Sequence, residues 1–368
     1  MSMNLSGNSV KNNLWSDFCI SKEPCFKVPL ISIIILNWNG KHLLDGCLWA
    51  LRSQTFRDFE VILVDNGSTD GSDIFVRSNY PEVRLVTLGS NLGFCGGNNQ
   101  GVKVANGEYI FFLNNDTEVA ATMLDELAKV AVSDPPQVGS WAVKMMRYDK
   151  RNVIDNRGCG YSAFGTGYQI GAGQIDDGSE QDNGLEWVFG PSGGAGCYRR
   201  SVLDEIGLFD EDFFFNNEDV DLSFRSQLAG YQCHYVPSAV VYHHGSATGG
   251  ATSDRTIYYI HRNKEWVFFK NMPGFLMWKY LPFHLAYSTA WVALWVFKGK
   301  AKVIFRAKWD ALSKWRAVLK KRQLIQSKRQ ADISCLDGLI DKKHLRDVWR
   351  SPSLPFKSII YRVRQVIP

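Results

Sequence analysis

Short apolar runs alternate with segments of helical spacing over the first third of the chain. Four runs of aliphatic and aromatic residues occupy positions 30–36, 59–64, 83–88 and 109–113. Between the first two, residues 43–51 carry apolar side chains three and four positions apart, which is the spacing of an amphipathic helix. Because strands that alternate with helices form a largely parallel sheet with helices on both faces, we predict an α/β fold.

Asparagine and aspartate residues follow the predicted strands. The candidate ligand-binding residues at these positions are Asn37, Asn39, Asp65, Asn91, Gly93, Asn114, Asn115 and Asp116. Ligands of open α/β sheets bind beyond the carboxyl ends of the strands, so we expect these residues to face one crevice. The chain has neither G-x-G-x-x-G after its first strand nor G-x-x-x-x-G-K-[ST], which argues against dinucleotide and Walker-type phosphate sites.

Two of these positions suggest specific chemistry. Asp116, with Asn114 and Asn115, supplies the oxygen ligands that Mg²⁺ or Mn²⁺ takes in proteins, and a substrate diphosphate would complete the coordination shell. Asp65 is placed to accept a hydrogen bond from the imide N–H of a uracil or thymine base. The alternative for both groups is a structural role, in which Asx turns cap the helices that follow.

A second acidic cluster lies at the start of another predicted helix. Glu218, Asp219 and Asp221 follow an aromatic run, and Arg225 lies one turn beyond Asp221. The helix dipole favours acidic residues at an N-terminus, but three of them exceed what capping needs. We therefore interpret Asp221 and Arg225 as a structural pair, and Glu218 and Asp219 as candidate catalytic residues.

Four ordered motifs resemble those of inverting glycosyltransferases of family 2, most closely the rhamnosyltransferase-like branch. They are residues 32–39, 64–71, 91–94 and 112–117. The resemblance covers about residues 29–270 and implies the GT-A fold, with a nucleotide-binding half and an acceptor-binding half. It implies that Asp116 is the metal ligand of a D-x-D motif, in which Asn114 replaces the first aspartate. It also implies that Asp219 is the catalytic base.

A pair of histidines and two arginines beyond the second acidic cluster are further candidates. His243 and His244 follow the second acidic cluster, and family 2 enzymes often have a histidine near the metal in this region. We assign His243, in preference to His244, to the side of the site that holds the metal and the diphosphate. Arg255 and Arg262 are expected to neutralise phosphate charge.

The segments around these residues carry weaker patterns. Residues 149–187 are rich in glycine and polar residues, and we predict a long irregular loop that borders the sugar site. The glycine-rich residues 189–197 would let the backbone approach a ligand closely. Residues 230–242 are interpreted as an edge strand that Pro237 interrupts.

Charge separates the chain into two parts. Residues 271–368 contain 20 Lys and Arg against 5 Asp, a net charge of +15, whereas residues 1–270 contain 22 basic and 32 acidic residues, a net charge of −10. The eight cysteines are scattered without a C-x-x-C pair, and we interpret them as reduced thiols. Residues 1–28 lack the pattern of a signal peptide and are interpreted as an N-terminal arm.

The basic part of the chain is predicted to contact an anionic membrane surface. Its uninterrupted apolar stretch, at 285–297, is shorter than the roughly 20 residues that span a bilayer. Further on, an apolar stripe at helical spacing is formed by Phe305, Trp309, Leu312, Trp315 and Leu319. A basic amphipathic helix of this kind lies on anionic lipid, and packing within a helical bundle is the alternative.

Together these features predict a GT-A domain at 29–270, divided into halves at 29–120 and 121–270, and a helical, membrane-associated region at 271–368. We expect the transfer of a sugar, with dTDP-rhamnose as one candidate donor, to a lipid-linked saccharide during assembly of a bacterial O-antigen or capsule. The expected location is peripheral, on the cytoplasmic face of the inner membrane, with no nucleic acid as partner. The absence of a Q-x-x-R-W motif favours single addition over processive synthesis. The competing interpretation is a non-catalytic membrane- or nucleic-acid-binding protein that uses its basic region.

Overall fold

The computed structural model describes residues 28–176, 186–245 and 253–343, and its centre is a ten-stranded mixed sheet of order β10-β12-β6-β11-β4-β1-β2-β3, with β5 and β7 attached. The four apolar runs form β1 (Ile31–Asn37), β2 (Phe59–Asp65), β3 (Arg84–Thr87) and β4 (Tyr109–Asn114). All four are parallel, and β1 lies between β2 and β4. Their register pairs Asn37 with Asp65 and Leu36 with Asn114, so the polar strand ends share one edge.

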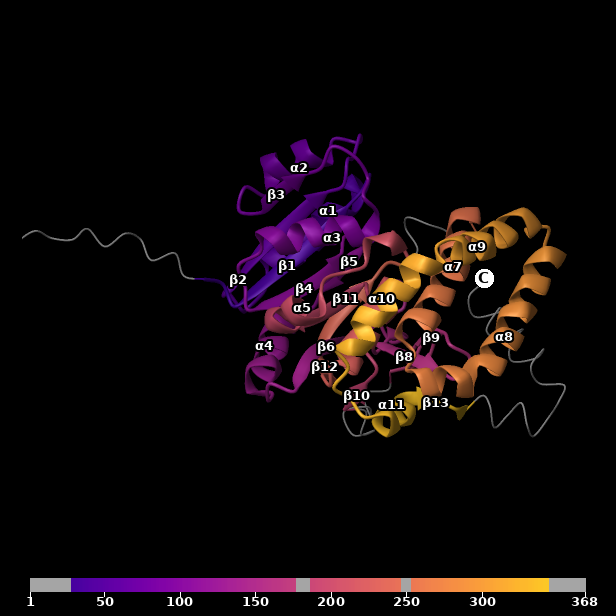
Figure 1. Ribbon diagram of the computed structural model, residues 1–368. Helices are drawn as coiled ribbons and strands as arrows, with labels where there is room; N and C mark the ends of the chain where they lie inside the picture. Colours follow the sequence, from indigo (N-terminus) through magenta and orange to yellow (C-terminus); the bar gives the residue numbers. More distant parts are fainter. Residues whose placement is uncertain (1–27, 177–185, 246–252, 344–368) are drawn as a thin grey trace, which may run out of the picture.

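Helices cover both faces of this sheet (Figure 1). One face carries α1 (Lys41–Arg52), α2 (Ser72–Asn79) and α4 (Met123–Ser133), and the other carries α3 (Gly93–Val104), α5 (Arg200–Ile206) and α6 (Glu218–Leu228). Alternate strand residues divide between the two cores, because successive side chains point to opposite faces. Ile34 and Phe112 thus pack on the α3 face, and Ile33 and Phe111 on the α1 face. The predicted α/β class is confirmed.

The second half of the sheet contains antiparallel strands. β11 (Ala195–Arg199) lies between β4 and β6 (Val138–Arg147), antiparallel to both. β12 (Gln232–His243) is parallel to β6 and antiparallel to β10 (Trp187–Val188) and β5 (Thr117–Val119). The interpretation of this segment as an edge strand is therefore wrong. Pro237 is accommodated at a register shift between Val236 and Val240, where a ladder hydrogen bond is not required.

Residues expected to form one irregular loop contain several short strands. β7 (Ile154–Asn156) extends the main sheet beside β6, and β8 (Cys159–Ser162), β9 (Gly167–Gln169) and β13 (Ile340–Asp341) form a second sheet. Strands of three or four residues are too short to show a periodic pattern, which is why the prediction missed them. Residues 177–185 of the expected loop lie outside the described residues.

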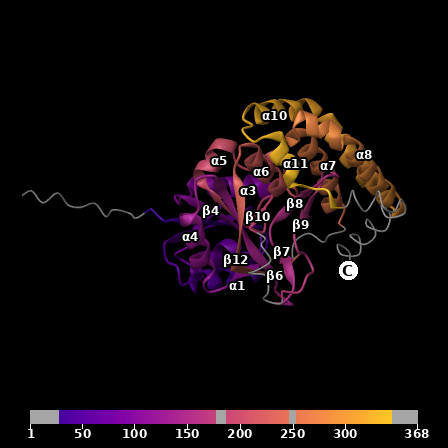
Figure 2. The ribbon, with the colours of Figure 1, turned by 90° about the horizontal axis from the view of Figure 1, so that it is seen from below.

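The C-terminal region is helical and packs on the sheet face that carries α3 and α6 (Figure 2). The helices described from residue 254 onward are α7 (Asp254–Asn271), which precedes this region, and then α8 (Gly274–Phe297), α9 (Ala301–Ser313), α10 (Trp315–Ser327) and α11 (Ile333–Leu339). The stripe expected on one helix is therefore divided between α9 and α10, which meet at Lys314. Within the described part of the chain, no helix combines the length and the apolar character needed to cross a membrane.

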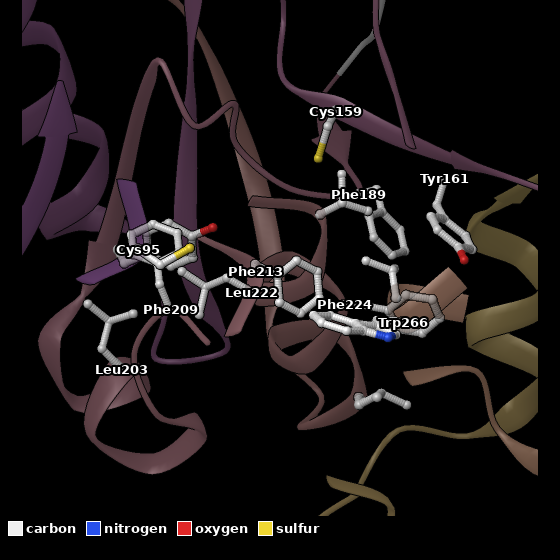
Figure 3. Packing of buried hydrophobic residues seen from close by; sticks show 14 of the residues in the cluster. Cys95, Cys159, Tyr161, Phe189, Leu203, Phe209, Phe213, Leu222, Phe224 and Trp266 are labelled. Atoms are coloured by element: carbon white, nitrogen blue, oxygen red, sulfur yellow. The ribbon is translucent and has the colours of Figure 1, made fainter. Parts of the chain in front are cut away.

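The core between the sheet and these helices is rich in aromatic side chains (Figure 3). Phe213 and Trp266 meet edge to face, with their ring centroids 5.8 Å apart. The indole N–H of Trp266 donates to the carbonyl of Ala311, 3.1 Å away, and so ties α7 to α9. Phe224 of α6 packs in the same cluster. The acidic start of α6 is therefore supported by a well-packed aromatic core.

Candidate functional site

A cleft lies beyond the carboxyl ends of β1 and β4, at the edge where the candidate ligand-binding residues are expected. Its volume of about 340 Å³ lies within the range of small-molecule sites. The predicted residues that line it are Asn91, Gly93, Asn114, Asn115, Asp116 and Arg255. The sequence analysis missed Trp38, Asn66, Phe214 and Phe215, which also line it. Trp38 and Asn66 are next to predicted positions in the sequence, and this was the only signal in the sequence that could have identified them.

Asn37 and Asn39 are placed outside the lining of this cleft. The Asn37 side chain is fully buried and accepts a hydrogen bond from the amide of Asn115, 2.8 Å away. Asn39 adopts a left-handed conformation, with φ of 52°, and its side-chain oxygen accepts from the backbone N–H of Thr69 at 2.8 Å. Both residues thus hold the strand ends and the loop after β2 in place around the cleft.

Asp65 ends β2 as a buried carboxylate with an unused acceptor. Its Oδ1 atom has no hydrogen-bond partner among the described residues, and the side chain is 2% exposed. A buried polar atom without a partner is costly, so such an atom at a strand end calls for a ligand or another explanation. Asp65, like Asn37 and Asn39, is not among the residues that line the cleft.

Asn66 organises the loop that leads into α3. Its amide donates to the side-chain oxygen of Asn91 at 3.1 Å and to the carbonyl of Gly93 at 3.1 Å, and its own oxygen accepts from the N–H of Leu92 at 2.9 Å. Asn91 also accepts from the N–H of Gly93. The predicted residues Asn91 and Gly93 are therefore held at the cleft by a neighbour of Asp65.

Gly93 also permits a close approach between α3 and the second half of the chain. Its φ is +75°, and a Cβ atom there would lie 2.5 Å from the carbonyl oxygen of Phe214. That oxygen accepts hydrogen bonds from the N–H groups of Phe94, at 2.7 Å, and Cys95, at 3.4 Å. A side chain at position 93 would push Phe214 and Phe215, which form the aromatic wall of the cleft, away from α3.

Asp116 and His243 face one another at one end of the cleft. The Nε2 atom of His243 lies 3.4 Å from Asp116, and its Nδ1 atom lies 3.0 Å from Asp155. His244 instead stacks on Tyr148, with ring centroids 3.7 Å apart. The structure thus places the imidazole of His243, and not that of His244, beside the Asp116 carboxylate, although the backbone N–H of His244 donates to the Asp116 carbonyl at 2.9 Å.

The protonation of this pair follows from its geometry. Burial opposes the charged form of His243, but its contacts with Asp116 and Asp155 outweigh burial and raise its pKa to about 10. Burial likewise opposes ionisation of Asp116, yet the contact with His243 leaves its pKa below the usual range. These shifts favour a protonated His243 beside an ionised Asp116.

These residues fit a divalent cation in part. A histidine whose second ring nitrogen meets a carboxylate, as His243 meets Asp155, is the usual arrangement of a metal-ligating histidine. The described residues contain no cluster of three or more His, Cys, Asp and Glu side chains able to hold a metal. Asp116 and His243 would therefore need diphosphate oxygens and water to complete the shell, as Mg²⁺ sites commonly do.

A glycine-rich turn connects this end of the cleft to Asp219. A Cβ atom at Gly194 would lie 3.5 Å from the side-chain nitrogen of Asn114, and one at Gly193 would lie 3.3 Å from Asp219. The N–H of Gly193 donates to Asp219 at 3.0 Å, and the N–H of Val220 donates to its other oxygen at 2.8 Å. The turn thus lies between Asn114, which lines the cleft, and Asp219, which does not.

Glu218 and Asp219 differ in their availability as bases. Glu218 is buried, its Oε2 atom has no partner among the described residues, and burial together with the charge of Asp219 raises its pKa well above the usual range. Burial also raises the pKa of Asp219, but its backbone hydrogen bonds favour the ionised form. Glu218 is therefore held neutral, and Asp219 is the carboxylate that faces the glycine turn.

Asp221 lies in a buried ionic network. It accepts from Arg225 at 3.0 Å, as the sequence spacing suggests, and also from Lys270 and Asn271, each at 2.7 Å. Lys270 contacts Asp210 as well, at 2.6 Å. Burial opposes ionisation of Asp210, but Lys270 and a second lysine outweigh it and hold its pKa below the usual range. These charges join α6 to α7 and leave no free acid for catalysis.

The two predicted arginines have different surroundings. Arg255 lines the cleft, where its guanidinium lies over the rings of Trp38 and Phe214, 5.4 and 5.3 Å from their centroids. Arg262 is buried, and its guanidinium donates to the carbonyls of Asp212 and Phe213 at 2.7 and 2.9 Å. The expectation that Arg262 contacts phosphate is not met, because its guanidinium already donates hydrogen bonds to backbone carbonyls.

Comparison with known proteins places this geometry in context. The chain matches the model described as glycosyl transferase family 2 over residues 32–207, and the one described as glycosyl transferase family group 2 over residues 179–305. It is 27% identical over 244 residues to the N-acetylglucosaminyl-diphospho-decaprenol L-rhamnosyltransferase of Mycobacterium tuberculosis, which covers 60% of this chain and 78% of that protein.

Two further similarities are more limited. The chain is 29% identical over 238 residues to the O-antigen biosynthesis protein RfbC of Myxococcus xanthus, which covers 62% of this chain and 18% of that protein. Among solved structures, it is similar to the mannosyltransferase PcManGT from Pyrobaculum calidifontis in complex with GDP-Man and Mn²⁺. That match has a TM-score of 0.49 and 18% identity, and covers 82% of this chain and 86% of the other.

Proposed function

The chain belongs to glycosyltransferase family 2, and we propose that it transfers a sugar, with inversion, from a nucleoside diphosphate donor to a hydroxyl group of a saccharide acceptor. The observation that carries this proposal is the glycine turn that lies between the cleft and Asp219. Asp116 and His243 lie at one end of the cleft, and the turn at Gly193 and Gly194 leads to Asp219. Family membership also favours an enzyme over the competing interpretation of a non-catalytic binding protein.

Asp219 is proposed as the general base. In an inverting transfer, the acceptor oxygen attacks the anomeric carbon on the face opposite the leaving diphosphate, and a carboxylate takes the hydroxyl proton. Asp219 has both oxygens fixed by backbone N–H groups, so its direction is set before substrate binds. Glu218 beside it is buried and has a raised pKa, so its carboxyl group is less suited to take the proton than Asp219.

Asp116 and His243 are proposed to hold Mg²⁺ or Mn²⁺, with Asp155 orienting the histidine. Such a cation, when bound, would neutralise charge on the departing diphosphate. Asn114 lines the cleft in the position of a first acidic ligand and offers a neutral oxygen instead. Arg255, which also lines the cleft, would supply further positive charge to the phosphates.

The donor is proposed to carry a uracil or thymine base, with dTDP-rhamnose as the leading candidate. The unpaired Oδ1 atom of Asp65 supports an acceptor for the imide N–H of such a base. The rhamnosyl group is suggested by the name of the mycobacterial relative, which also suggests a lipid-linked saccharide as acceptor. The relative from Myxococcus suggests a role in O-antigen or a related surface polysaccharide.

A peripheral location on an anionic membrane surface, at the cytoplasmic face of the inner membrane, completes the proposal. Support comes from the orientation of α9. Its small or aliphatic residues Ile304 and Ala307 are buried, whereas Phe305, Trp309 and Leu312 are 57%, 71% and 64% exposed. A ridge of large apolar side chains that faces outward on a basic helix is suited to insertion among anionic lipids.

The test of the enzymatic proposal is a screen of UDP-, dTDP- and GDP-sugars for hydrolysis in the presence of Mn²⁺. We expect turnover of a uracil or thymine nucleotide sugar, with dTDP-rhamnose the best of the panel. The proposal is overturned if no nucleotide sugar is hydrolysed and no nucleoside diphosphate raises the melting temperature.

The test of the membrane proposal is flotation on anionic liposomes. Replacing both Phe305 and Trp309 by serine should reduce flotation, whereas Trp49→Ser is the matched control, because Trp49 is 60% exposed on α1, on the other sheet face. Added salt should weaken binding without abolishing it, since charge is screened beyond about 8 Å and the apolar ridge is not affected. Equal flotation of the double variant and the control would refute the role of the ridge.

A further inference from the structure

We propose that Asn263, in the middle of α7, is a positioning residue that holds the aromatic wall of the cleft and the start of α6 in their working geometry. The role assigned to Asp219 rests on the proposed function. The hydrogen bonds by which Asn263 holds the segment before α6, called the clamp below, are present in the structure and do not depend on that function.

The segment between Phe213 and Glu218 has a strained backbone. Phe214 has φ of 64° and ψ of −52°, and the N–H of Phe215 donates to the carbonyl of Phe213 at 2.7 Å, which defines a γ-turn. This turn is rare because it places a side chain in a disfavoured region. Asn216 and Asn217 follow with φ of 67° and 65°. Backbone of this kind persists only where its surroundings hold it in place.

Asn263 supplies much of that support. Its side chain is fully buried, and its Nδ2 atom lies 3.0, 2.8 and 2.7 Å from the carbonyl oxygens of Phe213, Phe215 and Asn216. Its Oδ1 atom accepts from Nε of Arg262 at 2.9 Å, which fixes the orientation of the amide. One side chain of α7 therefore holds three of four consecutive carbonyl groups.

The fourth carbonyl is held from the opposite side. The oxygen of Phe214 accepts from N–H groups at the start of α3, so the segment is fixed between α3 and α7. Phe214 and Phe215 line the cleft, and the acidic pair Glu218 and Asp219 begins directly after the segment. A shift of this backbone would move the aromatic wall of the cleft and the proposed base, Asp219, together.

Loss of the clamp should therefore affect turnover as well as structure. A displacement of about 1 Å that arises away from the reacting atoms can cost on the order of 10²-fold in rate. We expect Asn263→Ala to lower kcat by about that factor. Asn271→Ala is the matched control, because Asn271 is also fully buried in α7 but donates to Asp221, away from the strained segment.

The experiment measures hydrogen exchange of residues 211–221 by mass spectrometry, together with kcat and KM for dTDP-rhamnose hydrolysis with Mn²⁺, in the wild type and both variants. Asn263→Ala should accelerate exchange in this peptide and lower kcat, whereas Asn271→Ala should leave the exchange of residues 211–217 and kcat near wild type. If Asn263→Ala does not fold, Asn263→Ser, with one hydroxyl donor, should show an intermediate effect.

The outcomes separate the clamp from the proposed function. Unchanged exchange in residues 211–217 of the Asn263 variant would overturn the clamp. Accelerated exchange with wild-type kcat would overturn the positioning role. Accelerated exchange in a protein whose wild type hydrolyses no nucleotide sugar would support the clamp and refute the proposed function instead.

Discussion

Replacing Asp219 by asparagine is the most direct test of the catalytic assignment. The change removes the negative charge and the proton-accepting group while it keeps the size of the side chain. It also alters two contacts, because the carboxylate accepts from the N–H groups of Gly193 and Val220 at 3.0 and 2.8 Å. An asparagine oxygen can keep one of these hydrogen bonds, and its NH₂ group cannot accept the other.

The two consequences differ in size. Loss of one such hydrogen bond should cost about 0.5–1.5 kcal/mol of stability. Loss of a general base should lower turnover by a factor of roughly 10² to 10⁴, which corresponds to about 2.7–5.5 kcal/mol of activation free energy. The kinetic effect of Asp219→Asn should therefore exceed its effect on folding.

The assay measures kcat and KM for sugar transfer, and donor affinity by calorimetry with dTDP and Mn²⁺. Asp219 is not part of the cleft lining around Asp116, so donor affinity should stay near wild type. The wild type should lose activity at low pH, because the base must be ionised. Burial raises the pKa of Asp219, so this loss should begin above the pH expected for a free aspartate, whose pKa is about 3.9.

Two results would refute the reasoning. Near-normal turnover of Asp219→Asn would remove this residue from the role of base. A loss of turnover accompanied by an equal loss of dTDP affinity would assign Asp219 to donor binding instead.

Three further predictions concern the metal, ionisation and stability. Asp116→Ala should abolish Mn²⁺-dependent dTDP binding, and EDTA should inhibit the wild type; equal calorimetric affinity with and without cation would refute the metal site. Glu218 has a raised pKa, so its contribution to stability is present at low pH and lost as pH rises above the pKa of a free glutamate, about 4.3; Glu218→Gln should therefore gain stability relative to wild type as pH rises, and a pH-independent difference in urea unfolding would contradict this. Lys270→Met should destabilise the fold by about 3–5 kcal/mol, because it leaves Asp210 and Asp221 without their shared cation; a urea midpoint near wild type would show that the network contributes little.

The positions of the main strands and of the polar strand ends could be predicted from the sequence. The runs that form β1 and β4 are long enough to show a clear apolar pattern, and parallel strands necessarily bring their carboxyl ends to one edge. That rule brings the ends of β1, β2 and β4 to one edge, and the register there pairs Asn37 with Asp65 and Leu36 with Asn114. The grouping of Glu218 and Asp219 at a helix start was equally visible, because it depends on neighbours in the sequence.

Only the tertiary structure decided which of these residues face the cleft and which support it. Asn37 is turned into a contact with Asn115, and Asn66, one position beyond a predicted residue, lines the cleft. Register and side-chain direction between strands decide such outcomes, and the pattern of a single strand does not record them.

The same reason explains the larger differences. Asn263 lies about 50 residues from the backbone that it holds, so no local pattern marks it. The apolar stripe of α9 predicted an apolar face but not whether that face points to the core or to the surface. α9 packs against α7 with Ile304 and Ala307 buried, so Trp309 is on the surface. Local periodicity determined where elements form, whereas contacts between distant segments determined what each side chain meets.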